Sequence, residues 1–124
     1  MKSVLRQVRI SPKKANIAAG LVRGKDVKEA LDILNFTSKK GAKLVYKAIK
    51  SAASNAENNF KQSLDNLYIK EIIVNEGMTY KRSMPASRGR SHPILKRNAH
   101  ITVKIDVKTE ASKKTKSATT ADSK

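Results

Sequence analysis

Residues 100–107 read His-Ile-Thr-Val-Lys-Ile-Asp-Val, an unbroken alternation of polar and apolar side chains. Because successive side chains of a strand point to opposite faces, this pattern predicts a strand with one face on a hydrophobic core. Residues 67–74, which are rich in Ile and Val, predict a second strand. Val4, Val8 and Ile10 indicate a third, weaker strand near the N-terminus. Together these segments predict a small, largely antiparallel sheet.

Two helices are predicted between the N-terminal strand and the middle of the chain. Ser11, as a cap, and Pro12, at the first helical position, begin a helix near 12–23 that ends before Gly24. Asp26 can cap a second, shorter helix that ends at Asn35 and Phe36. The apolar stripe of this second helix consists of Val27, Ala30, Leu31 and Leu34, at the spacing i, i+3, i+4 and i+7.

The third predicted helix is the longest and lies near 39–58. The capping pair Thr37-Ser38 precedes it, and an Ala-rich buried side allows close approach of a neighbouring layer. Its apolar positions are Ala42, Val45, Tyr46, Ile49, Ala52, Ala53 and Ala56, and its other positions include Lys39, Lys40, Lys43, Lys47 and Lys50. The pairs Asn58-Asn59 and Asp65-Asn66 predict turns that bracket a polar loop before the next strand.

This order of elements predicts an α+β fold, with three helices packed on one face of the three-stranded sheet. A chain of 124 residues is long enough for one modest core. We therefore expect a single globular domain over residues 1–107, which includes an extended β-hairpin at about 77–99. Residues 108–124 are rich in Lys, Ser and Thr and have no apolar periodicity, so we expect a disordered tail there.

The composition excludes several classes of protein. No apolar run approaches the ~20 residues that span a bilayer, and the first ten residues lack the apolar stretch of a secretory signal. We therefore expect a soluble protein. The absence of Cys and the presence of only two His argue against disulfides, thiol catalysis and a metal site. The net charge of +17 favours a polyanionic partner, with nucleic acid ahead of an anionic membrane surface.

The positive charge is concentrated in one segment. Residues 1–76 have a net charge of +8, residues 77–105 of +7 and residues 106–124 of +2. The middle segment contains no carboxylate and holds four of the seven Arg residues. The most specific charge signal therefore lies between the two best-predicted strands.

Residues 78–98 are too many for an ordinary hairpin loop of about 2 to 5 residues. A turn is predicted at Ser87-Arg88-Gly89-Arg90, with the pairs Lys81-Arg82 and Lys96-Arg97 on the two sides. Two arms of roughly ten residues would extend on the order of 30 Å beyond the sheet. Such an arm is expected to be mobile when free and to be ordered by a partner that carries phosphates.

The side-chain chemistry of this segment favours RNA. The planar guanidinium of Arg holds a phosphate with two hydrogen bonds or lies against a base. The competing interpretation is a solvated basic loop that keeps the protein soluble. Pro85 and Pro93 are expected to blunt a strand edge rather than to wedge between bases. His100 has no Ser or carboxylate partner at a catalytic spacing, so we expect it to be structural or to contact RNA.

Nine short motifs follow one another between Ile10 and Val107. They are Ser11-Pro12-Lys13-Lys14-Ala15, Leu21-Val22-Arg23-Gly24-Lys25, Ala30-Leu31-Asp32-Ile33-Leu34, Asn55-Ala56-Glu57-Asn58, Lys81-Arg82, Met84-Pro85, Arg88-Gly89-Arg90, Ile94-Leu95-Lys96-Arg97 and His100-Ile101-Thr102-Val103. In this order they resemble the family of bacterial large-subunit ribosomal proteins that bears the number twenty-two.

The resemblance implies a globular body on the outside of the large ribosomal subunit and a hairpin that threads inward through ribosomal RNA. The implied function is to bind and organise this RNA during subunit assembly, with the hairpin tip in the wall of the nascent-peptide exit tunnel, close to where macrolide antibiotics bind. The implied partners are large-subunit ribosomal RNA, neighbouring ribosomal proteins and the nascent polypeptide. The resemblance implies a cytoplasmic protein on the ribosome, with no enzyme activity, cofactor, metal, membrane contact or homo-oligomer.

The resemblance also assigns roles to residues of this chain. The tip comprises residues 87–91, and Arg88, Gly89 and Arg90 are expected at the tunnel or its RNA wall. Lys81, Arg82, Lys96 and Arg97 are expected to contact phosphates along the arms. On the body, the expected RNA contacts are Arg9, Lys13, Lys14, Arg23, Lys25 and His100.

Three features depart from the family pattern. Ala86 stands where members often have a basic residue, which implies one RNA contact fewer near the tip. Asn98-Ala99-His100 replaces a common Thr-Ser-His, a conservative difference. The resemblance ends after Val107, so the role of the tail does not transfer from the family.

Two other functions compete with this prediction. A DNA-bending architectural protein would also use a basic ribbon with a Pro near its tip, but it would bind duplex DNA and usually dimerise. An enzyme acting on RNA would need a catalytic acid and base near the basic arm, and residues 77–105 contain no carboxylate.

Overall fold

The computed structural model describes residues 1–108, so the predicted tail of residues 108–124 lies outside the described residues except for Lys108, whose N–H bonds to the Asn66 carbonyl at 2.8 Å. Its central strand is β5 (Ala99–Val107), which pairs antiparallel with β1 (Lys2–Val8) on one side and β2 (Leu67–Glu76) on the other. Buried and half-buried side chains alternate along β5, as predicted. β2 is two residues longer than predicted, and the three-stranded sheet is entirely antiparallel.

The edge strand β1 is confirmed, but its alternation is broken. Ser3 is buried, whereas the side chain of Val4 is 40% exposed. Gln7 adopts a left-handed φ of 51°, and the register against β5 shifts between Leu5 and Val8. This irregularity has the character of a β-bulge, which changes the face to which later side chains point. Ile10 therefore reaches the core although Val4 does not.

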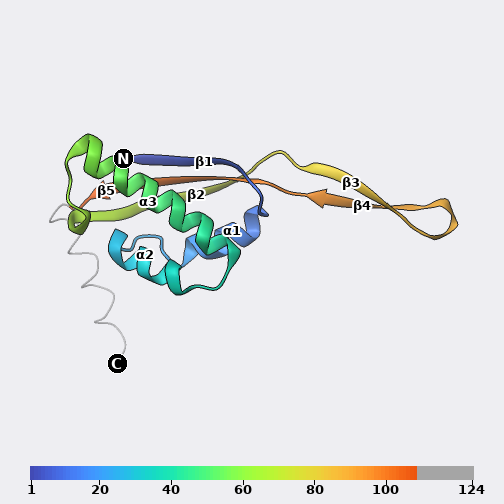
Figure 1. Ribbon diagram of the computed structural model, residues 1–124, viewed down its shortest axis with the longest axis horizontal. Coiled ribbons are helices and arrows are strands. Elements are labelled where there is room, and N and C mark those ends of the chain that lie inside the picture. Colours follow the sequence, from blue (N-terminus) through green and yellow to red (C-terminus); the bar gives the residue numbers. More distant parts are fainter. Residues whose placement is uncertain (109–124) are drawn as a thin grey trace, which may run out of the picture.

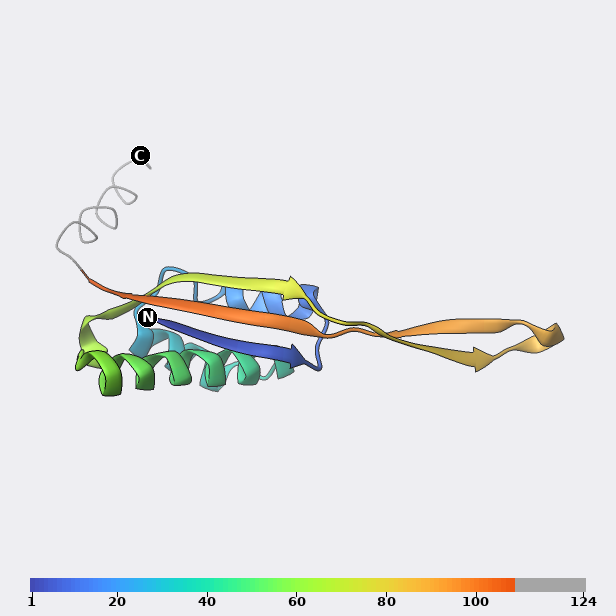
Figure 2. The same ribbon diagram turned by 90° about the horizontal axis from the view of Figure 1, so that it is seen from above.

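Three helices cover one face of the three-stranded sheet (Figures 1 and 2). They are α1 (Pro12–Gly20), α2 (Val27–Phe36) and α3 (Lys40–Phe60). The predicted α+β architecture is thus confirmed. The buried side of α3 is rich in Ala, as expected, and the core continues into Ile69, Ile101 and Val103 of the sheet.

The predicted end of α1 and the predicted cap of α2 need correction. α1 ends at Gly20, earlier than predicted, because the chain turns so that Val22 and Arg23 both donate backbone N–H bonds to the Ala19 carbonyl, at 3.2 Å each. Asp26 occupies the N-cap position of α2 but its side chain forms no cap bond. Its carboxylate lies 3.0 Å from the ammonium of Lys108 instead.

The limits of α3 also differ from the prediction. Thr37 does not cap α3; its hydroxyl donates to the carbonyl of Ile33 at 2.7 Å and helps to end α2. The predicted turn at Asn58-Asn59 is wrong, because α3 continues to Phe60. The helix ends where Lys61 adopts a left-handed φ of 49° and the Gln62 N–H bonds to the Ala56 carbonyl at 3.2 Å.

A second, two-stranded sheet forms the hairpin, from β3 (Tyr80–Pro85) and β4 (Ser91–Lys96). Figures 1 and 2 show it extending from one end of the three-stranded sheet, away from the helices. All six residues of β3 are exposed, and β4 is exposed except at Ile94, which is half-buried. The hairpin therefore has no core of its own within the described part of the chain.

Candidate nucleic-acid interface

The antiparallel pairing of β3 with β4 sorts the side chains of the hairpin onto two faces. Tyr80 lies opposite Lys96, and Arg82 lies opposite Ile94, so these four residues share one face. Lys81 alternates with Arg82 along β3 and belongs to the other face. The predicted arm residues Lys81, Arg82 and Lys96 therefore give positive charge to both faces.

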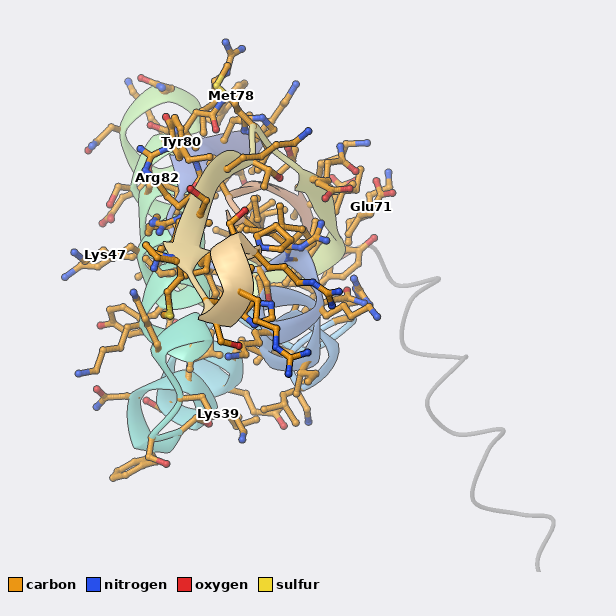
Figure 3. The ribbon with its side chains drawn as sticks, turned by 90° about the vertical axis from the view of Figure 1, so that its right-hand side faces the viewer. Lys39, Lys47, Glu71, Met78, Tyr80 and Arg82 are labelled. Carbon is orange, nitrogen blue, oxygen red and sulfur yellow. The ribbon has the colours of Figure 1, made fainter. Side chains whose placement is uncertain are left out.

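The arm also carries an aromatic side chain beside a cation. The guanidinium carbon of Arg82 lies 6.0 Å from the centroid of the Tyr80 ring, at the outer limit of a cation–π contact. Met78, Tyr80 and Arg82 lie on the same side of the hairpin in Figure 3. This group offers a flat surface and a positive charge together, a combination suited to bases and phosphates.

The predicted turn at the tip is confirmed. A short 3₁₀ turn (Ser87–Gly89) connects the strands, and the Ala86 N–H bonds to the Arg90 carbonyl at 2.8 Å. Arg88 and Gly89 have positive φ values of 57° and 67°. Residues 87–91 of the tip are all exposed, and Ala86 just before them is half-buried, so Arg88 and Arg90 are accessible to a partner.

Arg97 lies at the base of the hairpin, after the end of β4. Its guanidinium donates to the carboxylate of Glu76 at 2.7 Å. Close by, the Gly77 N–H donates to the Asn98 carbonyl at 2.9 Å and continues the pairing of the segments that enter and leave the hairpin. Arg97 thus lies at the junction between the hairpin and the three-stranded sheet, with its charge partly balanced by Glu76. Its expected contact with a phosphate stays a prediction.

His100 has a structural contact at this junction. Its Nδ1 accepts a hydrogen bond from the Gln7 N–H at 3.1 Å, which joins β5 to the irregular end of β1. The Asn98 amide donates to the Gln7 side-chain oxygen at 3.4 Å, and Asn98 is buried. An ideal Cβ on Gly77 would lie 3.0 Å from that same oxygen, so Gly permits this close packing. The structural part of the expectation for His100 is confirmed, and RNA contact stays a prediction.

Several predicted basic residues converge on a cleft between the hairpin base and the helices. We call it the basal cleft; its volume is about 780 Å³. It lies between the first turns of α1 and α3 and the end of β4. Its cationic lining consists of Arg9, Lys14, Lys39, Lys40, Lys96 and Arg97. Lys39 and Lys40 were not among the predicted site residues. Their position at the start of a helix, Lys39 at the N-cap and Lys40 as the first residue, is the available signal, because cations there oppose the helix dipole.

The other predicted body residues lie elsewhere. Arg23 donates to the Ile72 carbonyl at 3.1 and 3.0 Å and to the Asn16 side chain at 2.6 Å, so it ties the end of α1 to β2. Lys25 forms an exposed ion pair with Glu29 at 2.6 Å. Lys13 is exposed and is not part of the basal cleft.

The described residues contain no cluster of three or more His, Asp or Glu that could hold a metal ion. Within residues 1–108, no helix combines the length and the apolar character that a membrane crossing requires.

Comparison with known proteins identifies the family. The family model described as ribosomal protein L22p/L17e matches residues 3–106. The large ribosomal subunit protein uL22 of Thermotoga sp. (strain RQ2) is 51% identical over 104 residues, which cover 84% of this chain and 65% of that protein. The chain thus spans slightly less than two thirds of this relative. The uL22 proteins of Fusobacterium nucleatum subsp. nucleatum and Ligilactobacillus salivarius (strain UCC118) are 51% and 49% identical, over 84% and 86% of this chain and 94% and 93% of their own lengths. The chain therefore belongs to the uL22 family, whose members are structural, non-enzymatic proteins of the large ribosomal subunit.

Proposed function

We propose that this protein binds and organises large-subunit ribosomal RNA during subunit assembly, and that its hairpin tip lines the nascent-peptide exit tunnel. The observation that carries the proposal is the hairpin itself. It extends beyond the sheet, is exposed on both faces and lies in a segment of net charge +7 without a carboxylate. Threading through RNA gives these exposed cations their partners.

The energetics of an isolated hairpin support a polyanionic partner. A two-stranded ribbon is at best marginally stable in water, and like charges along its arms repel one another. Phosphates on both sides of the arm would remove this repulsion. The two faces carry Lys81 on one side and Arg82 and Lys96 on the other, which fits an arm surrounded by RNA better than one lying on a flat surface.

The roles of single residues follow from their positions. Lys81, Arg82 and Lys96 contact phosphates along the arms, and Arg82 with Tyr80 provides a surface for a base. Arg88 and Arg90, at the exposed tip, face the tunnel or its RNA wall. Arg97 and His100 act at the hairpin base. Arg9, Lys13 and Lys14 add contacts from the body, whereas Arg23 and Lys25 are engaged by neighbouring protein groups.

The remaining expectations belong to the same proposal. Residues 1–107 form one RNA-binding domain that includes the hairpin. The partners are large-subunit ribosomal RNA, neighbouring ribosomal proteins and the nascent polypeptide in transit. The protein acts as a single copy on cytoplasmic ribosomes, without a membrane contact.

A binding comparison tests the proposal against the DNA-bending alternative. The full chain is titrated with transcribed large-subunit ribosomal RNA and with duplex DNA at the same nucleotide concentration. We expect tighter binding to the RNA at moderate salt, with a salt slope on the order of −5 if about seven phosphates are contacted. Tighter binding to the duplex, or affinity that does not vary with salt, contradicts the proposal.

Co-sedimentation provides the second test. The protein should remain with large subunits through a wash at moderate salt, because an arm enclosed by RNA leaves slowly. A protein that washes off completely, or that is recovered on DNA, contradicts an enclosed arm.

A further inference from the structure

The basal cleft has a charge pattern that protein groups do not balance. Its described lining contains six cations and no carboxylate, and one of these cations, Arg97, is paired with Glu76. Lys39 and Lys40 are exposed, and neither forms an ion pair with a described carboxylate. Cations that gather in a concave site without acids create a strongly positive potential. The charge of the cleft therefore favours an anion.

The backbone adds to this potential. The first turns of α1 and α3 both line the cleft, and neither contains an acidic residue. Neither helix has a side-chain bond at its N-cap, so the free N–H groups of both first turns lack a side-chain acceptor. Lys14 and Lys40 stand at the positive ends of these helices, where a cation is unfavourable. An anion in the cleft would accept hydrogen bonds from these N–H groups and would also balance the charges of Lys14 and Lys40.

Close approach of the two helices creates the cleft. An ideal Cβ on Gly41, in the first turn of α3, would lie 3.1 Å from the Lys14 carbonyl and 3.3 Å from Ile10 Cδ1. Gly41 therefore lets the two helix starts meet without a side chain between them. Two Lys-bearing turns from distant parts of the sequence are thereby held together.

Apolar side chains are also accessible in the cleft. Ile17 and Leu95 are 59% and 46% exposed, and the buried Ile10 also lines the cleft. An inorganic anion gains nothing from contact with such apolar surfaces, whereas the ribose and base of a nucleotide can pack against them. The volume of about 780 Å³ is large enough for more than one phosphate group.

From these features we infer that the basal cleft binds the sugar-phosphate backbone of one ribosomal RNA strand. Phosphates lie against the cations of α1 and α3, and a ribose with its base lies against Ile17 and Leu95. This inference rests on the proposed function and adds to it a defined site off the arms. Because Leu95 and Lys96 come from β4, a strand bound here contacts body and hairpin together and fixes their relative direction.

Continuity with the arm favours RNA over an acidic protein segment. Lys96 belongs both to the arm and to the cleft. A strand that follows the phosphate contacts of the arm arrives at the cleft without interruption. A protein partner would need a separate run of acidic residues to reach the same place.

The test compares two pairs of Lys on α3. Lys39→Gln/Lys40→Gln removes two cleft charges, and Lys47→Gln/Lys50→Gln removes two charges from the same helix outside the cleft. Figure 3 shows Lys39 below the hairpin and Lys47 at the side of the molecule. All four Lys are exposed, so we expect both variants to fold. Circular dichroism and thermal unfolding of the full-length variants check this.

Binding to transcribed large-subunit ribosomal RNA is measured from about 50 to 200 mM salt, a range over which phosphate contacts weaken strongly. Losing two phosphate contacts lowers the magnitude of the salt slope by about 1.4 to 1.8. We expect this change for the cleft variant and less than half of it for the control. Equal slopes for the two variants would overturn the inference.

Ethylation interference locates the contact on the RNA. Ethylated phosphates at a short run of nucleotides should weaken binding of the unaltered protein, and the cleft variant should lose this sensitivity at that run alone. An interference pattern for the cleft variant that is identical to that of the unaltered protein contradicts binding of RNA in the cleft.

The design separates the two proposals. Failure of the unaltered protein to prefer this RNA defeats the proposed function. Normal binding by the unaltered protein and by both variants leaves the proposed function intact and defeats only the basal cleft, as would be found if an acidic protein segment were its occupant.

Discussion

At the scale of single residues, Gly41 makes the sharpest prediction about packing. A larger side chain there would meet the Lys14 carbonyl, the Ile10 side chain and the Ala18 Cβ at 3.1 to 3.4 Å. Since a backbone carbonyl has little freedom to move, we expect Gly41→Val to destabilise the protein by roughly 1–3 kcal/mol through overpacking. Urea unfolding followed by circular dichroism measures this change.

Gly20 provides a control at a glycine with open space around it. It is the last residue of α1, and an ideal Cβ there meets no heavy atom within 4 Å. Gly20→Ala should leave stability unchanged or raise it by up to about 1 kcal/mol, because Ala restricts the unfolded chain. If both glycines tolerate a side chain equally, the contact between the starts of α1 and α3 is looser than the structure indicates.

The hairpin tip makes a second prediction at this scale. Gly89 has a φ of 67°, in the left-handed region that side chains branched at Cβ adopt poorly. Gly89→Val should therefore break the tip bond from the Ala86 N–H to the Arg90 carbonyl and speed hydrogen exchange at Ala86. The tip touches no helix, so the thermal unfolding midpoint of the body should not move. A shifted midpoint would show that the tip contributes to the stability of the body.

At the scale of elements, an ion pair between β2 and β5 predicts a pH effect. A hydrogen bond from Lys70 at 3.1 Å, and next a bond from the Val107 N–H, hold the pKa of Asp106 below its usual value. We expect Lys70→Gln to raise the pKa of Asp106 only part of the way, because the Val107 bond remains. Carboxyl carbon shifts in an NMR titration measure it, with Lys28→Gln, which removes the Asp65 ion pair, as the control.

The same pair affects stability with a definite sign. The pKa of Asp106 is lower in the folded than in the unfolded protein, so the contribution is present above about pH 4 and is lost as the pH falls through the folded pKa. The difference in unfolding free energy between the unaltered protein and Lys70→Gln should therefore shrink below about pH 4. A difference that grows on acidification would contradict the assignment.

Elements with a strong local pattern were predictable from the sequence. The alternation along β5 and the Ala-rich side of α3 each arise because one face of the element packs on the hydrophobic core. Both predictions are confirmed. Some departures from the prediction are local, such as the bond from the Thr37 hydroxyl to the Ile33 carbonyl, and others arise where a group bonds with a partner distant in the sequence. Asp26 bonds with Lys108 rather than capping α2, and the bulge at Gln7 is tied to His100 across the sheet. Neither partner is visible from spacing along the chain.

The candidate site shows the same division. The tip turn and the arm residues Lys81, Arg82 and Lys96 follow from one contiguous basic segment. The basal cleft brings together residues from three elements, and its Lys39 and Lys40 had been assigned only to the outer surface of a helix. Arg97 is predicted on the arm from its place beside Lys96, whereas the fold brings it to the base of the hairpin, where it pairs with Glu76 at the end of β2. Sequence reasoning found the charges, and the fold determined which of them act together.

At the scale of the whole molecule, body and hairpin are separable parts of one chain. The hydrophobic core lies in the helices, the three-stranded sheet and their connections, and the hairpin contributes no buried residue to it. Replacing residues 84–93 by one Gly leaves Arg82 opposite Ile94, their native pairing, with Ser83 and the new Gly as a two-residue loop. We expect this shortened protein to fold with an unchanged thermal midpoint.

RNA binding by the shortened protein should change in a specific way. The deletion removes Arg88 and Arg90 but keeps Lys81, Arg82, Lys96 and the basal cleft. The magnitude of the salt slope should therefore fall by no more than about 1.4 to 1.8, the value for two phosphate contacts. Because less of the arm is enclosed, the shortened protein should also leave isolated large subunits faster during a salt wash. Loss of all RNA binding would show that the tip, rather than the base of the hairpin and the body, holds the protein on RNA.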